Sequence, residues 1–113
     1  MKTRLAALLL ALATVVVVSC SGKPGHPGLL VTGDPPELYA DYAIFARRCS
    51  KCHGLSRALD SGFDTDAKWI AYVTRMRRQP ASGITETDAV AILRYLHVRV
   101  RRQREAKAAE ETK

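Results

Sequence analysis

Three segments of the chain carry apolar residues at the three- and four-residue spacing of an amphipathic helix. In ELYADYAIFARRC (37–49) the stripe consists of Leu38, Tyr42, Phe45, Ala46 and Cys49. In DTDAKWIAYVTRMRRQP (64–80) it contains Trp69, Tyr72 or Val73, and Met76. In ITETDAVAILRYLHVRV (84–100) it contains Ala89, Ile92, Leu93, Leu96 and Val100. No segment alternates convincingly as a strand, so the pattern predicts an all-α domain.

Local signals indicate where these helices begin and end. Pro35 and Pro36 suit the start of the first helix. One of the polar residues 64–66 is a candidate cap for the second helix, and Pro80 would stop it. Thr85 with Asp88 three residues later approximates a capping box at the start of the third helix.

After Val100 the sequence RRQREAKAAEETK has no apolar face. We therefore expect the last helix to continue for a turn or two and then fray. Residues 101–113 are accordingly predicted to be a charged C-terminal tail.

The chain begins with the pattern of an export signal. Lys2 and Arg4 flank the start of an apolar run over 5–18, which is short of the roughly 20 residues that span a bilayer. The run closes with VVSC, which resembles a bacterial lipobox. This resemblance implies removal of a lipoprotein signal peptide, 1–19, and lipidation of Cys20. A signal peptide cut elsewhere, or an uncleaved anchor, is the alternative interpretation.

Between the signal and the first helix, residues 20–35 are rich in Gly and Pro and show no periodicity. This composition is typical of a flexible tether. The folded domain is therefore predicted over 36–100. Three short helices bury little apolar surface, so a domain of this size usually needs a disulfide, a metal or a cofactor to stabilise it.

The motif CSKCH supplies the candidate chemistry. Cys49 and Cys52 are separated by two residues, and His53 follows directly. This spacing is the attachment signature of a c-type haem. Both thiols reach one edge of the porphyrin and form thioethers, and the histidine projects to the iron from the same side. The motif predicts Cys49 and Cys52 as covalent haem attachments and His53 as the proximal iron ligand.

Three other interpretations of the motif remain. A zinc site needs about four ligands, and only the scattered His26 and His97 could add to the motif. A thioredoxin-like redox pair expects a preceding strand and an α/β sheet. A disulfide between Cys49 and Cys52 would close too small a loop to stabilise much. With a zinc site or with a disulfide, the protein would be a haem-free interaction module.

Residues 36 to about 100 resemble the small single-haem bacterial cytochromes c. The resemblance rests on a helix that enters CxxCH, a middle helix, and a last helix ending in the pair Tyr95 and Leu96. It implies a domain of three or more helices around a covalently bound haem. It also implies that the first and last helices cross, with Phe45 against Tyr95. The haem would be shielded from water by Phe45, Trp69 and Leu93.

Met76 is the predicted sixth iron ligand. It is the only methionine left after signal removal, and WIAYVTRM resembles the W-x-x-x-V-x-x-M pattern of one group of these cytochromes. Many small cytochromes c place this methionine in a loop before the last helix, whereas Met76 falls inside or at the end of the middle one. A core methionine is the alternative role. His97 is the second candidate ligand, and His26 could ligate only by folding back.

The formal net charge is +7, of which two units lie in the signal segment. Basic residues gather around the motif and around Met76; they are Arg47, Arg48, Lys51, Arg57, Arg75, Arg77 and Arg78. Cations around a haem edge would steer redox partner proteins with acidic docking surfaces, and one could pair with a haem propionate. A solvated basic surface without a partner is the alternative. No nucleic-acid motif accompanies the charge, so no nucleic-acid partner is predicted.

Together these features predict a one-electron carrier that is not an enzyme. It would be lipid-anchored in the bacterial cell envelope, facing the periplasm or the outer face of the cell membrane. A haem-based ligand sensor or a weak peroxidase is the alternative, and would follow if the sixth iron position were open.

Overall fold

In the computed structural model, which describes residues 30–113, four helices follow one another. They are α2 (Pro36–Cys49), α3 (Ser56–Leu59), α4 (Asp66–Arg77) and α5 (Glu86–Glu111). No strand occurs in this part of the chain. The all-α prediction and the three helices inferred from apolar stripes are confirmed. The short helix α3 has no such stripe, and the pattern does not predict it. The predicted signal and Cys20 lie outside the described residues.

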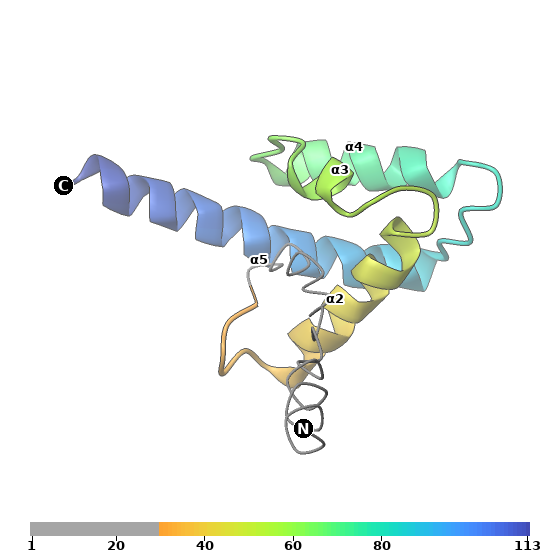
Figure 1. Ribbon diagram of the computed structural model, residues 1–113, viewed down its shortest axis with the longest axis horizontal. Coiled ribbons are helices and arrows are strands. Elements are labelled where there is room, and N and C mark those ends of the chain that lie inside the picture. The colour runs from red at the N-terminus through yellow and green to blue at the C-terminus, as the bar shows by residue number, and fades with distance from the viewer. Residues whose placement is uncertain (1–29) are drawn as a thin grey trace, which may run out of the picture.

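The first and last described helices cross (Figure 1). At the crossing the rings of Phe45 and Tyr95 lie 5.0 Å apart, centroid to centroid. Tyr42 meets the edge of Tyr95 at 5.3 Å. The predicted contact between Phe45 and Tyr95 is therefore confirmed, and this aromatic cluster fixes how α2 lies on α5.

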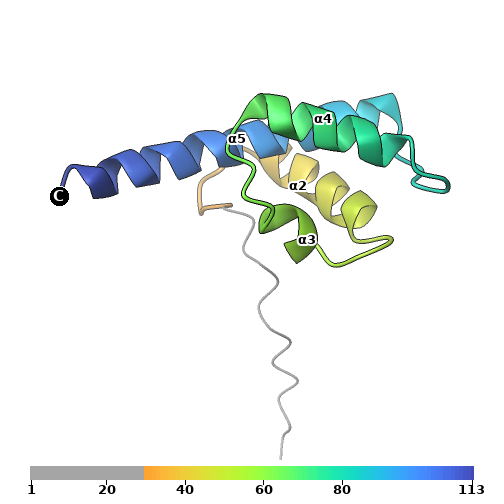
Figure 2. The same cartoon turned by 90° about the horizontal axis from the view of Figure 1, so that it is seen from above.

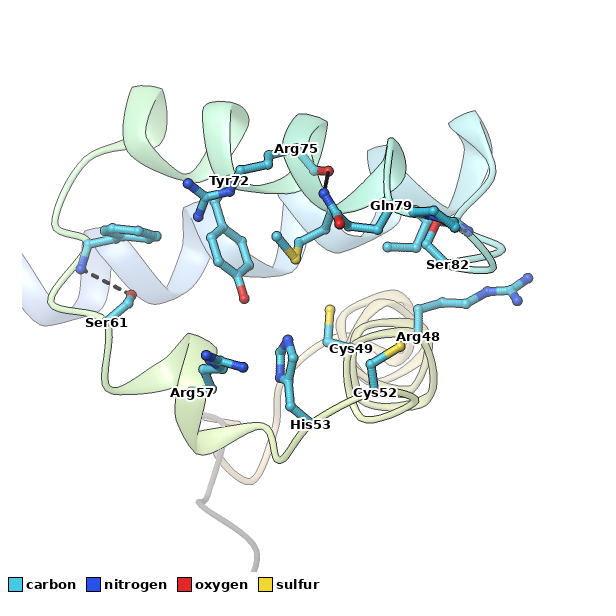
Figure 3. A pocket seen from close by; sticks show the side chains of 14 residues that line it. Arg48, Cys49, Cys52, His53, Arg57, Ser61, Tyr72, Arg75, Gln79 and Ser82 are labelled. Atoms are coloured by element: carbon cyan, nitrogen blue, oxygen red, sulfur yellow. Dashed lines mark hydrogen bonds between the residues drawn. The ribbon is translucent and has the colours of Figure 1, made fainter.

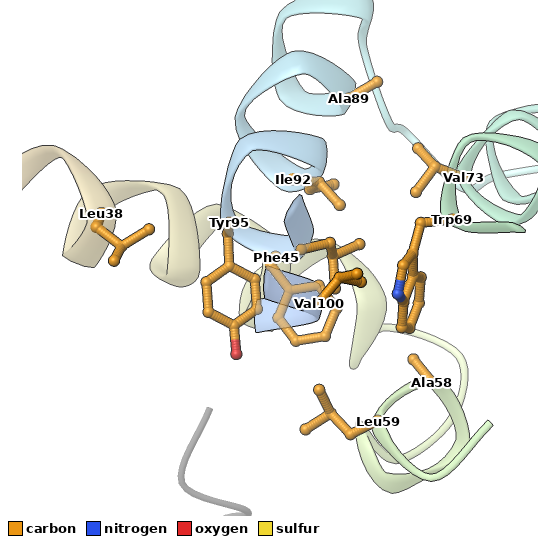
Figure 4. Close-up of a cluster of buried hydrophobic side chains, with 11 residues drawn as sticks. Leu38, Phe45, Ala58, Leu59, Trp69, Val73, Ala89, Ile92, Tyr95 and Val100 are labelled. Atoms are coloured by element: carbon orange, nitrogen blue, oxygen red, sulfur yellow. The ribbon is translucent and has the colours of Figure 1, made fainter. Parts of the chain in front are cut away.

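Helices α3 and α4 cover the other side of α5 and complete one core (Figure 4). Its largest fully buried side chains are Trp69, Tyr95, Phe45, Ile92, Leu96 and Val100. Trp69 has no exposed surface and lies edge-on to Phe63 and Tyr72, at 5.1 and 5.7 Å between ring centroids. Leu93, by contrast, is only partly buried.

Side-chain caps start the second and third predicted helices. Thr65 accepts a hydrogen bond from the Lys68 backbone N–H at the start of α4. Thr85 and Asp88 form the predicted capping box at the start of α5, with both hydrogen bonds 3.0 Å long. Asp88 also pairs with Arg48 at 2.9 Å, which ties the start of α5 to the last turn of α2.

The end of the predicted tether is held to the folded domain. Arg102 donates two hydrogen bonds to the carboxylate of Asp34, whose side chain is buried. The hydroxyl of Tyr39 donates to the carbonyl of Val31 at 2.9 Å, and Leu30 packs against the core. The domain therefore begins before its first helix.

Helix α5 runs to Glu111, well past the turn or two expected after Val100 (Figures 1 and 2). Its last turns consist almost entirely of Arg, Gln, Glu, Ala and Lys, which are strong helix formers. Arg104 donates to the carbonyl of Asp64 at 3.1 Å, but most of the later side chains are exposed. The intrinsic helix propensity of these residues extends α5. A prediction from apolar stripes alone does not take this propensity into account.

Within residues 30–113, no helix is both long enough and apolar enough to cross a membrane.

Candidate cofactor-binding site

A cavity with a volume of about 680 Å³ lies between the CSKCH segment and α4. Cys49, Cys52, His53 and Met76 all line it. The side chains around it come from the end of α2, the turn that follows, α3, α4 and the loop before α5 (Figure 3). The volume falls in the range of small-molecule and cofactor sites. The structure thus brings all four residues predicted to hold a haem to one cavity.

The two cysteines differ in their surroundings. Cys49 is the last residue of α2 and is half-buried, whereas Cys52 lies in the following turn and is exposed. Burial raises the pKa of the Cys49 thiol to about 11. Neither cysteine forms a disulfide within residues 30–113. A thiol held protonated differs from the low-pKa thiolate that a thioredoxin-type redox pair needs.

His53 is oriented by the backbone that follows it. Its Nδ1 lies 3.2 Å from the carbonyl oxygen of Gly54. Because a carbonyl can only accept, this contact places the proton on Nδ1 and leaves Nε2 as the nitrogen with the free lone pair. The same carbonyl accepts the backbone N–H of Arg57, so the turn into α3 fixes the ligand's orientation. This is the arrangement that metal-binding histidines use.

Met76 lies in the last turn of α4, one residue before its end. The sequence placed it inside or at the end of the middle helix, and this is confirmed. The stripe that buries Trp69 and Val73 carries Met76 to the cavity, where it is half-buried.

The loop after α4 is fastened to the CSKCH segment. Lys51 donates to the carbonyl of Ala81 at 2.8 Å, and Ser82 donates to the carbonyl of Arg77 at 3.2 Å. Ala81 and Gly83 both have positive φ angles, 60° and 65°. A Cβ added at Gly83 would lie 3.4 Å from the Arg48 guanidinium. These contacts hold the loop at the mouth of the cavity.

The cavity walls are not the ones the resemblance implied. Phe45, Trp69 and Leu93 do not line it; the apolar lining comes from Phe63, Tyr72 and Ile84. Trp69 stands one layer behind, in edge contact with two of these. Phe45 and Trp69 are absent from the wall because they lie deepest in their helix stripes and pack against other helices, whereas Tyr72, at the margin of its stripe, faces the cavity. Phe63, in a loop without periodicity, offered only its aromatic character as a signal.

His97 does not line the cavity. Its Nε2 lies 3.9 Å from a carboxylate oxygen of Asp66, at the first residue of α4, whereas Met76 lies near the last. The structure therefore separates the second candidate ligand from the motif. His26 lies outside the described residues.

Within the described residues, no three or more side chains of the types His, Cys, Asp and Glu come together to hold a metal ion. A haem iron needs only two ligands from the protein, because the porphyrin supplies four. One imidazole nitrogen and one thioether sulfur complete its coordination.

No protein-family model, curated protein or solved structure matches the chain. The assignment of the site therefore depends on its residues alone.

The residues of the cavity fit a c-type haem by their chemistry. Two thiols come from one turn, the imidazole presents a free Nε2, and the thioether comes from the facing helix. Apolar and aromatic side chains form much of the wall. Three arginines, Arg48, Arg57 and Arg75, also line the cavity. Such a set suits a flat, largely apolar group that carries anionic substituents.

Proposed function

We propose that this protein is a one-electron carrier that uses a covalently attached c-type haem. The observation that carries the proposal is the meeting of Cys49, Cys52, His53 and Met76 at one cavity. The four residues come from two segments more than twenty positions apart, and the fold brings them together.

Each of these side chains has a distinct role in the proposal. Cys49 and Cys52 would hold the haem through thioethers, and His53 would bind the iron through Nε2. Met76 would bind the iron through its sulfur, and a methionine sulfur raises the reduction potential relative to a second histidine. When bound, the haem supplies an iron that gains and loses one electron.

Part of the wall and the loop would shield a bound haem from water. Phe63, Tyr72 and Ile84 give it apolar surface, and the bond from Lys51 to Ala81 holds the loop over the cysteine side. A dry site favours the less charged state of a bound metal and limits the solvent reorganisation that accompanies electron transfer. The protein breaks no substrate bonds in this account.

Location and partners belong to the same proposal. Lipidation of Cys20 would anchor the domain in the bacterial cell envelope, facing the periplasm or the outer face of the cell membrane. Its partners would be redox proteins with acidic docking surfaces. The covalent attachment of haem and the export signal are consistent with each other, because c-type haem is attached outside the cytoplasm.

The test is the near-infrared absorption spectrum of the oxidised protein, produced together with haem-maturation machinery. A charge-transfer band from methionine sulfur to iron is expected, and it should disappear in Met76→Ala. His97→Gln is the matched control and should retain the band, since His97 lies away from the cavity.

Other outcomes separate the alternatives. Covalent haem without the band in the parent protein would contradict the role of Met76 and favour a ligand sensor or weak peroxidase with an open iron position. Absence of covalent haem in the mature protein would overturn the proposal as a whole.

A further inference from the structure

The cavity has two chemically different ends. Figure 3 shows the cysteines on one side of His53, and Arg57 and Ser61 on the other. Tyr72 and Arg75 of α4 lie over the second side. One end therefore offers sulfur, and the end away from the cysteines offers hydroxyl and guanidinium groups.

The Tyr72 hydroxyl points into the cavity, toward the side on which Arg57 lies (Figure 3). The Arg75 guanidinium lies 5.5 Å above the centroid of the Tyr72 ring. Burial is the main reason that the pKa of Tyr72 is raised, and the charges of Arg75 and Arg57 act in the opposite direction. Ser61 accepts the backbone N–H of Phe63, so its own O–H remains available to donate.

The arginines differ in how their charge is compensated. Arg48, at the cysteine end, is paired with Asp88 at 2.9 Å. Within residues 30–113, neither Arg57 nor Arg75 forms an ion pair with a carboxylate. Both side chains line the cavity and are also exposed to solvent, so each guanidinium is available to bind an anionic group that enters the cavity.

We propose that Arg57 and Arg75, with the hydroxyls of Ser61 and Tyr72, form a receptor for the two carboxylates at the edge of the haem opposite its cysteine attachments. The inference rests on the proposed function and adds the orientation of the bound group. Guanidinium groups bind carboxylates through paired, charge-assisted hydrogen bonds. The four donors come from α3, the loop after it and α4, so the bound carboxylates link the two walls of the cavity.

The sequence around the motif gives this receptor a direct test. Residues 46–59 contain no Asp or Glu. After the folded, haem-loaded protein is treated with a water-soluble carbodiimide and an amine, it can be cleaved after Phe45 and Leu59. Any amide carried by the haem-bearing peptide must then lie on the haem carboxylates. Mass spectrometry counts the added groups as a function of time.

Slow labelling is expected in the parent, because both carboxylates are engaged. In the double variant Arg57→Gln with Arg75→Gln, labelling should become at least about tenfold faster. Arg77→Gln is the matched control: it removes the same charge from α4 at a residue that does not line the cavity, and should label at the parent rate. Arg57→Lys with Arg75→Lys keeps the charge and should restore part of the protection.

The failures are distinguishable. Rapid labelling of both carboxylates in the parent would overturn the receptor while leaving the haem in place. Equal labelling of the double variant and the parent would show that other groups protect the carboxylates, and would overturn the assignment to Arg57 and Arg75. A peptide without haem would overturn the proposed function itself.

Discussion

A single side chain, Asp34, extends the folded domain beyond its first helix. Its carboxylate receives two hydrogen bonds from Arg102 of α5, across most of the length of the domain in sequence. The hydrogen bond from Arg102 is the main reason that the pKa of Asp34 lies below its ordinary value. The gain in stability from this pair therefore depends on pH.

Because the folded pKa is lowered, the contribution of Asp34 is fully present above the ordinary aspartate pKa of about 3.9. It is lost as the pH falls through the lower pKa of the folded state. Asp34→Asn is expected to unfold at a lower temperature than the parent at pH 7, and the two midpoints should begin to converge once the pH falls below the ordinary aspartate pKa. Circular dichroism during heating measures both. Glu105→Gln, an exposed change on α5, is the control and should differ little at any pH; a constant gap between Asp34→Asn and the parent would contradict the linkage.

At the level of residues, the sequence predicted that the side chains of the CSKCH motif would share one site, because that placement depends on local spacing. Cys49, Cys52 and His53 need only a helix and a turn to face one way. Phe63 and Ile84 were missed as wall residues because their positions depend on how α4 and the loop before α5 fold back. Arg57 and Arg75 were indistinguishable from the other basic residues until the structure showed which of them face inward.

Among the elements, α5 has two halves that differ in sequence and in packing. Its first half packs in the core through Ile92, Tyr95 and Leu96, which are all fully buried. Its second half extends beyond the other helices (Figure 2). There its ion pairs, between Arg101 and Glu105 and between Lys107 and Glu111, are exposed and 4.0 and 3.9 Å long.

Removal of residues 106–113 is therefore expected to change the free energy of unfolding by less than about 1 kcal/mol, because exposed pairs four residues apart contribute little. Ile92→Ala, in the buried half of the same helix, should cost about 2–5 kcal/mol. Urea unfolding of the haem-loaded protein compares the two. A loss from truncation as large as that from Ile92→Ala would show that the overhang carries tertiary contacts.

The elements could be predicted where an apolar stripe or a cap encodes them. Three helices and the capping box of Thr85 and Asp88 follow from such patterns. The sequence pattern predicted too short an α5, because a helix that forms by intrinsic propensity needs no apolar face. It missed α3, whose four residues are too few for a period and which forms where the turn after His53 packs Ala58 and Leu59 into the core.

On the scale of the whole molecule, charge is segregated by segment. Residues 47–59 and 67–85, which supply the two walls of the cavity, contain eight Lys and Arg residues and no Asp or Glu. The acidic residues lie in the other segments, and several of them are paired, as Asp41 is with Arg94 and Asp34 is with Arg102. The cavity therefore opens in the cationic part of the domain.

For the proposed electron carrier, this arrangement predicts that electron transfer to a small anionic oxidant, such as hexacyanoferrate(III), slows as ionic strength rises. Screening acts over about 10 Å at 0.1 M salt, so the effect should be clear between 10 and about 200 mM. Arg77→Glu, beside the cavity, should lower the rate at low salt more than Arg101→Glu, which makes the same charge change on the far part of α5. Stopped-flow measurements would contradict local steering if both variants slowed equally.

Trp69 gives the molecule a built-in spectroscopic reporter. It is the only tryptophan of the chain, has no exposed surface, and touches Phe63 and Tyr72 from behind the cavity wall. Its emission therefore comes from a single indole in a dry environment, one ring away from whatever occupies the cavity. A chromophore in the cavity would accept the excitation energy and quench the fluorescence of that indole. The fluorescence intensity of a sample would then measure the fraction of molecules whose cavity holds no chromophore.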